Sequence, residues 1–292
     1  MKLEQKIGVI GNGFVGGAVE FGFSPNVGCD AEVRVYDKNP NKSTHGLEET
    51  VNESDFIFLS VPTPANDDGS INIDIITNAL DDISKVHEGR DNAILIRSTV
   101  IPGTTWKLQT EYPQLNILFN PEFLTERSAN FDFINQSRFI IGNNGKQMSW
   151  AKSEEFAELI KDRFGDCVSI METNYETAEL IKYMNNCFFA TKVSFMNEMY
   201  QIAEKSNVNW QQAIDGLVAD GRVGHSHMNV PGHDGKFGFG GSCFPKDVQA
   251  MRNFAESIGV NPSVLAAVWR KNLEVRPEQD WKELKGRAVT DE

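Results

Sequence analysis

Short apolar runs alternate with helical patterns over the first 173 residues of the chain. Each run is largely apolar, and together they cover residues 6–10, 33–36, 56–61, 93–99, 117–119, 139–142 and 168–170. Strands of this kind are typical of a parallel sheet that is covered on both faces. Apolar residues at helical spacing lie at 72–87, and again at Phe156, Leu159, Ile160 and Phe164. The pattern predicts an α/β domain over residues 1–173, with a doubly wound parallel sheet of the Rossmann type.

A long helical pattern without Pro or Gly follows, from Thr177 to Ala203. A helix that is apolar over so much of its surface belongs in a core or in a dimer interface. Two shorter helical patterns, 248–257 and 263–274, complete a predicted all-helical central domain over residues 174–276. We expect this long core helix to join two copies of the chain in a homodimer, through Phe188, Phe189, Phe195 and Met196.

The first strand leads into a Gly-x-Gly-x-x-Gly sequence made by Gly11, Gly13 and Gly16. The second strand ends at Asp37. In a dinucleotide-binding turn the three glycines form the turn, admit the pyrophosphate and pack the helix on the strand, while the acid binds the ribose hydroxyls. An ordinary βα turn is the alternative for the glycines alone, but strand, glycines, helix, second strand and acid together predict an NAD site. The loop residues expected to contact NAD are Gly11, Asn12, Gly13, Phe14 and Val15.

A second glycine-rich loop, residues 238–242, leads to Cys243 and is followed by Pro245, Lys246 and Asp247. Glycine lets a backbone approach a ligand closely, and a nearby lysine favours the reactive thiolate of a cysteine. An inert, buried cysteine in a tight turn is the alternative. A hydride acceptor next to an activated thiol would oxidise an alcohol or aldehyde to an acid through a thioester.

Polar residues just after strands supply further candidates. Thr63 and Thr99 follow two strands at the edge where ligands bind in open α/β sheets; strand-end threonines that cap a turn are the alternative. In Asn-Pro-Glu-Phe-Leu-Thr-Glu-Arg, Glu122 and Glu126 share one face if the segment is helical, although a solvated helix start has the same residues. In the long helix Lys182 and Asn186 point the same way, and a lysine in so apolar a helix requires an acidic partner or a substrate.

Composition restricts the partners. The 292 residues are 40% hydrophobic, which predicts a folded globular chain. A net charge of −13 and a pI near 4.9 argue against a nucleic-acid partner. Four cysteines without paired spacing, and no apolar run long enough for a membrane span, predict a cytoplasmic protein without a membrane partner. His225, His227 and His233 have no acid or cysteine to complete a ligand set, so no metal site is expected.

Taken together, these motifs resemble the UDP-glucose/GDP-mannose dehydrogenase family, and the Phe-Pro-Lys-Asp end of the cysteine loop is most similar to its UDP-glucose branch. The similarity runs from Lys6 to about Arg276. Typical members continue into a third domain, so the resemblance implies that residues 277–292 are the truncated start of that UDP-binding domain. It also implies a four-electron, NAD-dependent oxidation of UDP-glucose to UDP-glucuronate.

The resemblance implies three groups of site residues. The catalytic residues would be Cys243, Lys182, Asn186, Asp247, Glu122 and Thr99. NAD would be bound by the first glycine loop, Asp37, Thr63, Thr99, Glu126 and Lys246. The nucleotide sugar would be bound by Glu122, Phe123, Leu124, Glu126, Lys182, Asn186, Arg222, Lys236, Phe239, Gly240 and Cys243.

Several alternatives stay open at this point. The sugar could be GDP-mannose or a UDP-N-acetylhexosamine, and either Lys182 or Asp247 could be the first base. A two-electron enzyme, such as a 6-phosphogluconate or hydroxyisobutyrate dehydrogenase, would use Lys and Asn on a similar helix but needs no cysteine. A catalytically impaired nucleotide-sugar binding protein is the remaining alternative.

Overall fold

The computed structural model describes residues 3–291, and it divides the chain into two compact units. The first unit extends to Thr63 and resumes from Ile73 to Lys182. The second unit contains Pro64–Asn72 and the chain from Tyr183 onward. Helix α7 (Tyr175–Lys205) begins in the first unit and continues into the second.

Seven strands form one sheet in the first unit, within the described residues. They are β1 (Ile7–Ile10), β2 (Val33–Tyr36), β3 (Phe56–Leu59), β4 (Ala93–Ile96), β5 (Ile117–Phe119), β6 (Arg138–Asn143) and β7 (Ser169–Asn174). Their order is β2-β1-β3-β4-β5-β6-β7, and only the β5–β6 pair is antiparallel. The chain leaves β1 toward β2 on one side and returns to β3 on the other. The loop after β1 therefore lies at a topological switch point, where open α/β sheets bind their ligands.

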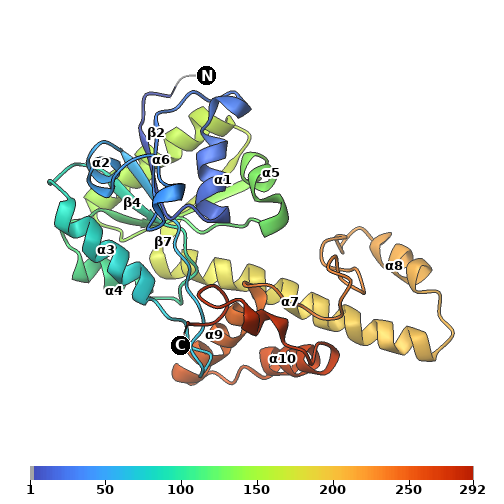
Figure 1. Ribbon diagram of the computed structural model, residues 1–292. Helices are drawn as coiled ribbons and strands as arrows, with labels where there is room; N and C mark the ends of the chain where they lie inside the picture. Colours follow the sequence, from blue (N-terminus) through green and yellow to red (C-terminus); the bar gives the residue numbers. More distant parts are fainter. Residues whose placement is uncertain (1–2, 292) are drawn as a thin grey trace. The chain divides into compact units, whose positions relative to one another are not determined.

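Helices cover both faces of this sheet, as the apolar strands predict (Figure 1). One face carries α1 (Phe14–Gly22), α5 (Ala129–Ile134) and α6 (Gln147–Phe164). The other carries α2 (Leu47–Asn52), α3 (Asp74–Val86), α4 (Thr104–Glu111) and the start of α7. Aromatic rings fill the first face; the centroids of Phe56 and Phe156, for example, lie 5.4 Å apart. The predicted doubly wound α/β fold is confirmed.

The second unit is mainly helical. Beside the rest of α7 it contains α8 (Trp210–Val218), α9 (Phe244–Ser257) and α10 (Ser263–Val275). Short 3-10 turns occur at η1 (Pro25–Val27), η2 (Pro40–Lys42) and η3 (Glu126–Ser128) in the first unit and at η4 (Asp280–Glu283) in the second.

The end of the chain folds onto the second unit. Trp281 is buried, and its ring centroid lies 5.5 Å from that of Trp269 on α10. The backbone of Ala65 accepts a hydrogen bond from the Thr290 N–H at 3.0 Å and donates one to the Ala288 carbonyl, also at 3.0 Å. The tail is thus packed and paired with the segment that follows β3.

Helix α7 presents a narrow apolar stripe in the second unit. Met184, Phe188, Phe195 and Ile202 are all more than half exposed. Their separations of four, seven and seven residues place them on one line along the helix. Two of the residues expected at a dimer interface differ: Met196 is buried in a cluster with Met228 and Val230, and Phe189 stacks on His227. The exposed apolar surface is therefore narrower than the composition of the helix predicts.

No helix in the described part of the chain has the length and hydropathy that a bilayer span requires.

Candidate active site

The glycine loop after β1 has the shape that a dinucleotide requires. Gly11 has a φ of +90°, and a Cβ there would lie 2.7 Å from the Ser60 carbonyl oxygen. A Cβ on Gly16 would lie 2.0 Å from the Gly11 oxygen, so α1 packs against the loop only with glycine at this position. Around Gly13 no other part of residues 3–291 lies within 4 Å of such a Cβ. The first and third glycines close the turn, and the second leaves space at the N-terminus of α1, where a pyrophosphate binds favourably.

Asp37 follows β2 at the same edge of the sheet. Its carboxylate accepts hydrogen bonds from the backbone N–H groups of Asn12 at 2.7 Å and Asn39 at 2.8 Å. One of these donors belongs to the glycine loop, so the acid and the loop are fixed relative to each other. A carboxylate in this position suits ribose hydroxyls and repels a 2′-phosphate.

Two threonines meet at the ends of β3 and β4. The Thr63 hydroxyl donates to the Thr99 carbonyl at 3.0 Å, and both residues are buried. The side chain of one strand end therefore holds the backbone of the next. This places Thr99 at the carboxyl edge of the sheet, together with the glycine loop.

Lys182 and Glu122 form a buried ion pair in the first unit. The Lys182 ammonium donates to the Glu122 carboxylate at 2.8 Å and to the Glu122 carbonyl at 2.6 Å. Their side chains are 3% and 7% exposed. Burial raises the pKa of Glu122, but the Lys182 ammonium and the Leu124 N–H, which donates at 2.6 Å, outweigh burial and hold that pKa below its ordinary value. Glu122 is thus an ionised carboxylate, and it is the acidic partner that Lys182 requires.

Arg97 is a third charge in this cluster, and the sequence analysis missed it. It is 1% exposed, donates to the Asn120 side-chain oxygen and lies 5.7 Å from the ring centroids of both Phe58 and Phe133. Burial lowers the pKa of Arg97 to about 10, against the attraction of Glu122, so the guanidinium stays charged at neutral pH. An arginine at the end of an apolar strand, two positions before Thr99, was the available signal.

The segment between β5 and η3 is not helical where Glu122 lies, so Glu122 and Glu126 do not share a face. Glu122 is buried, whereas Glu126 is exposed at the start of η3. Phe123 lies between two cations, with its ring centroid 4.2 Å from the Arg138 guanidinium and 5.5 Å from the Lys182 ammonium. Leu124 is half-buried and packs against the core of the sheet.

Glu179 lies one turn before Lys182 on α7 and is fully buried. Its carboxylate accepts hydrogen bonds from the backbone N–H groups of Gly103 at 2.6 Å and Thr105 at 2.7 Å, at the N-terminus of α4. The segment from Thr99 to α4 is thereby attached to the helix that carries Lys182. Burial raises the pKa of Glu179 to about 7, although the two N–H donors oppose that shift.

The raised pKa of Glu179 predicts a pH-dependent stability. Because the folded state holds this proton more tightly than the unfolded chain, its contribution is present below the ordinary carboxyl pKa and is lost as pH rises through about 7. Glu179→Gln cannot ionise. The free energy of unfolding of this variant relative to wild type should therefore rise by on the order of 2–3 kcal/mol between about pH 5 and about pH 8. Urea denaturation at both pH values measures it, and an unchanged difference would contradict it.

In the second unit, Cys243 occupies the N-cap position of α9. The sequence pattern predicted a helix from Val248, but the helix begins at Phe244 because Pro245 suits its first turn. The thiol therefore lies at the positive end of a helix dipole of 14 residues, which stabilises a thiolate. Within the described residues Cys243, Cys29, Cys167 and Cys187 form no disulfide.

Asp247 lies one turn after Cys243 and is fully buried. Its two carboxylate oxygens accept hydrogen bonds from the Asn186 amide at 2.6 Å and the Lys246 ammonium at 2.6 Å. Helix α7 thus supplies Asn186 to the group around the cysteine helix, four residues after it supplies Lys182 to the Glu122 pair. The structure assembles the candidate residues into two sets, one in each unit.

Comparison with known proteins decides the family. Residues 37–161 match the NAD binding domain of the UDP-glucose/GDP-mannose dehydrogenase family, and residues 176–274 match its central domain. The chain belongs to this family. Its α/β unit is accordingly an NAD-binding domain. The open space at Gly13 and the carboxylate of Asp37 are consistent with this assignment.

Individual relatives support the assignment to these nucleotide-sugar dehydrogenases. The UDP-glucose 6-dehydrogenase of Rickettsia prowazekii is 36% identical over 227 residues, which are 76% of this chain and 50% of the relative. The structure of a UDP-glucose dehydrogenase from Pyrobaculum islandicum has a TM-score of 0.76 at 28% identity, covering 92% of this chain and 68% of the other. A Mycobacterium tuberculosis 3-hydroxyisobutyrate dehydrogenase shares the fold alone, with a TM-score of 0.71 at 15% identity and 95% of each chain covered. The chain spans about half the length of the curated relatives it matches.

The residues expected to bind the substrate from the second unit have different surroundings. Arg222 is highly exposed and forms a two-pronged ion pair with Asp220, with 2.6 Å between its Nη2 and the Asp220 carboxylate. Lys236 donates to Asp280 at 2.8 Å. Phe239 is buried, and the chain at Gly240 passes against the Arg276 guanidinium. The two cations are accessible, whereas the two loop residues are part of the packing around the cysteine loop.

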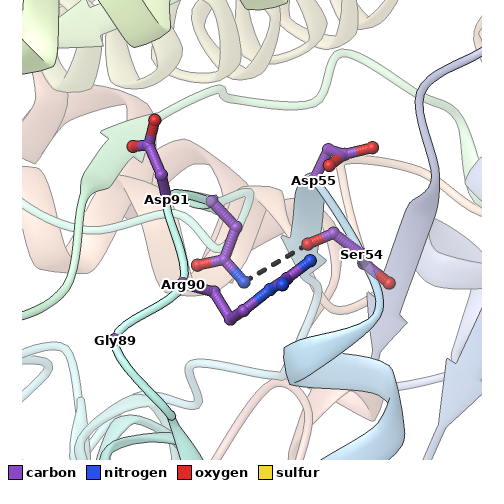
Figure 2. Close-up of a pocket in the computed structure, with 6 residues that line it drawn as sticks. Ser54, Asp55, Gly89, Arg90 and Asp91 are labelled. Atoms are coloured by element: carbon purple, nitrogen blue, oxygen red, sulfur yellow. Dashed lines mark hydrogen bonds between the residues drawn. The ribbon is translucent and has the colours of Figure 1, made fainter.

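A polar cavity of about 360 Å³ lies elsewhere in the NAD-binding unit (Figure 2). Residues that precede β3 and β4 line it, including Ser54, Asp55, Arg90 and Asn92. Since these are the amino-terminal ends of the strands, the cavity is at the edge opposite to the glycine loop. In residues 3–291 no group of three or more His, Cys, Asp or Glu side chains is arranged to hold a metal ion.

Family membership makes the nucleotide preference testable. NAD should be preferred over NADP because the Asp37 carboxylate repels a 2′-phosphate. Asp37→Ala should narrow the preference for NAD over NADP, mainly by raising the dissociation constant for NAD by about 10- to 100-fold. The reason is that charge-assisted hydrogen bonds to the ribose are lost. Titration of intrinsic fluorescence with each nucleotide measures both dissociation constants. Equal affinity of the wild-type protein for NAD and NADP would contradict the assignment.

Proposed function

We propose that this chain oxidises UDP-glucose to UDP-glucuronate, with NAD as the hydride acceptor and Cys243 as the covalent nucleophile. The observation that carries the proposal is the arrangement around α9, where a cysteine at the helix N-terminus precedes a buried aspartate held by Asn186 and Lys246. A simple two-electron alcohol dehydrogenase has no use for a thiol in this position. The relatives named UDP-glucose 6-dehydrogenase favour glucose as the sugar.

The proposed reaction has two oxidations. NAD, held by the glycine loop and Asp37, would supply the hydride acceptor for each of them, so two NAD would be consumed for each sugar. In the first, the C6 hydroxyl loses its proton to a base and its carbon loses a hydride, which leaves an aldehyde. The Cys243 thiolate then adds to the aldehyde carbon and forms a thiohemiacetal. Loss of a second hydride from the carbon, and of the hydroxyl proton to a base, gives a thioester. Water then adds to the thioester carbon and the carbon–sulfur bond breaks, which releases the acid and the Cys243 thiol.

The chain supplies donors and bases for these steps. Lys182 uses two of its three N–H groups on Glu122, and Asn186 uses one of its two side-chain N–H groups on Asp247. The remaining N–H groups would stabilise the oxyanion that develops on the substrate. Asp247 would be the general base that takes a proton from water, and Thr99 is the other residue proposed for this step. Glu122 would assist hydrolysis of the thioester, and either Lys182 or Asp247 would be the first base.

We also propose how the nucleotide end is held. Arg222 is an exposed cation of the second unit and Lys236 is a half-buried one, and the overall charge of the chain is −13. A diphosphate approaching so acidic a protein requires local cations, and Arg222 offers a planar group that pairs with two phosphate oxygens. The segment Glu122–Glu126 would contact the sugar, and Glu126 and Lys246 are the further residues proposed to bind NAD.

A stoichiometric assay tests the function. Purified protein is incubated with excess NAD and limiting UDP-glucose, and the NADH formed per sugar consumed is measured together with the acid product. Two NADH per UDP-glucose support the four-electron reaction. One NADH and an aldehyde product would instead indicate a two-electron dehydrogenase, and sugar binding without NADH would indicate a binding protein. GDP-mannose and UDP-N-acetylglucosamine in parallel reactions identify a different sugar preference.

We further propose that the chain forms a homodimer through the stripe Met184, Phe188, Phe195 and Ile202. These side chains repeat at nearly heptad spacing on one line of α7, which is how one helix packs on its symmetry mate. Phe195→Glu should raise the dimer dissociation constant by at least about 100-fold, because burying one phenylalanine contributes ~1.5–3 kcal/mol and the two-fold axis repeats it. Sedimentation velocity at micromolar concentration measures the mass.

Phe131→Glu is the matched control for that variant. Phe131 is 65% exposed but lies on α5 in the NAD-binding unit. Phe131→Glu should therefore leave the sedimentation mass of the protein unchanged. A wild-type protein that sediments as a monomer at micromolar concentration would overturn the dimer.

A further inference from the structure

The cysteine loop is held by an asparagine of α10. Asn272 is fully buried, and its side chain bonds both sides of residue 239 in the loop. The Phe239 N–H donates to the Asn272 side-chain oxygen at 2.7 Å, and the Asn272 amide donates to the Phe239 carbonyl at 2.9 Å. Only a side chain with one donor and one acceptor makes both bonds.

Two of the loop glycines, Gly238 and Gly240, have no room for a side chain, because Asn272 and Arg276 occupy the space where a Cβ would lie. A Cβ on Gly238 would lie 2.4 Å from the Asn272 side-chain oxygen, and Gly238 has a φ of +68°. A Cβ on Gly240 would lie 2.4 Å from the guanidinium of Arg276, the residue that follows α10. Around Gly241, by contrast, nothing in the described chain lies within 4 Å. Gly238 and Gly240 therefore serve the attachment to α10 and to Arg276 just after it, and Gly241 is the loop glycine with open space around it.

The attachment continues to the cysteine through an aromatic contact. The Phe239 ring packs edge-on against Phe244 at 6.2 Å between centroids, and it also contacts Trp269 of α10 at 6.4 Å. Phe244 is the first residue of α9 and directly follows Cys243. On the other side, Asn197 of α7 accepts a hydrogen bond from the Gly238 N–H at 3.0 Å.

We propose that Asn272 is a positioning residue for Cys243: it fixes the Phe239 peptide and thereby sets where α9 begins and where the thiol lies. This inference rests on the proposed role of Cys243 as the nucleophile. A nucleophile must be placed within a fraction of an ångström of its target, so a small displacement of its loop costs much rate. Asn272 acts only through the loop and is distinct from the groups that would touch the substrate.

Asn272→Asp tests the proposal because it preserves size while removing the donor to the Phe239 carbonyl. We expect kcat for acid formation to fall by about 10- to 100-fold, with the KM for NAD within twofold of wild type. Without substrates, the rate of Cys243 alkylation by iodoacetamide, read by mass spectrometry, should change by at least about threefold. The exposed Cys167 serves as the internal reference.

A matched variant separates positioning from general destabilisation. Asn92 is also buried, and its amide donates to the carbonyls of Val51 and Ser54 in the NAD-binding unit. Asn92→Asp should lower the melting temperature without changing Cys243 alkylation. If Asn272→Asp does not fold, Asn272→Ala is measured in the same way, since it removes both bonds without adding a charge.

The outcomes are distinct from those that test the function itself. Unchanged kcat and unchanged alkylation in a folded Asn272 variant would overturn the positioning role, as would equal changes in Asn92→Asp. Alkylation is measured without turnover, so it reports on the thiol even if acid formation is absent in the wild-type protein. In that case the proposed function fails, while the alkylation rates of the Asn272 variants still test the effect of Asn272 on the Cys243 thiol.

Discussion

Cys243→Ser should abolish acid formation while leaving NAD and UDP-glucose binding largely intact. The expected loss in the rate of acid production is at least about 10³-fold, because a serine hydroxyl stays protonated near neutral pH and attacks an aldehyde poorly. The position at the N-terminus of α9 favours an anion, but a hydroxyl is too weak an acid to exploit it. Product analysis by chromatography measures the acid, and calorimetric titration measures both ligands.

Two other cysteines make this result specific. Burial raises the pKa of Cys187 to about 12, with a contribution from Asp247, so Cys187 remains a thiol and is no substitute nucleophile. Cys167 is exposed in the NAD-binding unit, and Cys167→Ser should retain full activity. Near-native acid production by Cys243→Ser would contradict the thioester mechanism.

The NAD-binding unit was predictable from sequence because its signals are local. Apolar strands indicate a sheet that is covered on both faces. In the glycine loop, Gly11 is required by its own φ of +90° and Gly16 by the Gly11 oxygen, five residues earlier. The long helix was found for the same reason, as were α3 and α10. The short helices α2, α4, α5 and α8 lack long apolar periodicity, and they were not predicted.

The supporting residues were not predictable, since they are defined by distant partners. Glu179 bonds backbone groups 74 and 76 residues away, and Asn272 bonds a peptide 33 residues away. Nothing in the local sequence distinguishes either residue from an ordinary polar position on a helix. The glycines of the cysteine loop were interpreted as space for a ligand, but two of the three fit against α10, which only the folded chain reveals.

Lys182→Met should destabilise the protein by about 3–5 kcal/mol at neutral pH, because it leaves the Glu122 carboxylate buried without its main partner. Burial would then dominate the pKa of Glu122, which the ammonium now holds below its ordinary value. The loss of oxyanion stabilisation should also lower the rate of acid formation by about 10²- to 10³-fold. Chemical denaturation and the stoichiometric assay measure the two effects.

The pH dependence identifies the cause of that destabilisation. In the wild-type protein the lowered pKa of Glu122 contributes stability above the ordinary carboxyl pKa, and this contribution disappears as pH falls through the lower folded value. In Lys182→Met the carboxyl can accept a proton, so the difference from wild type should shrink as pH falls from about 7 to about 5. The double variant Lys182→Met with Glu122→Gln removes both charges and should recover part of the stability, because no charge is left unpaired apart from Arg97. A difference that is constant with pH, or a double variant no more stable than Lys182→Met, would show that Lys182 stabilises the unit by packing and not by neutralising Glu122.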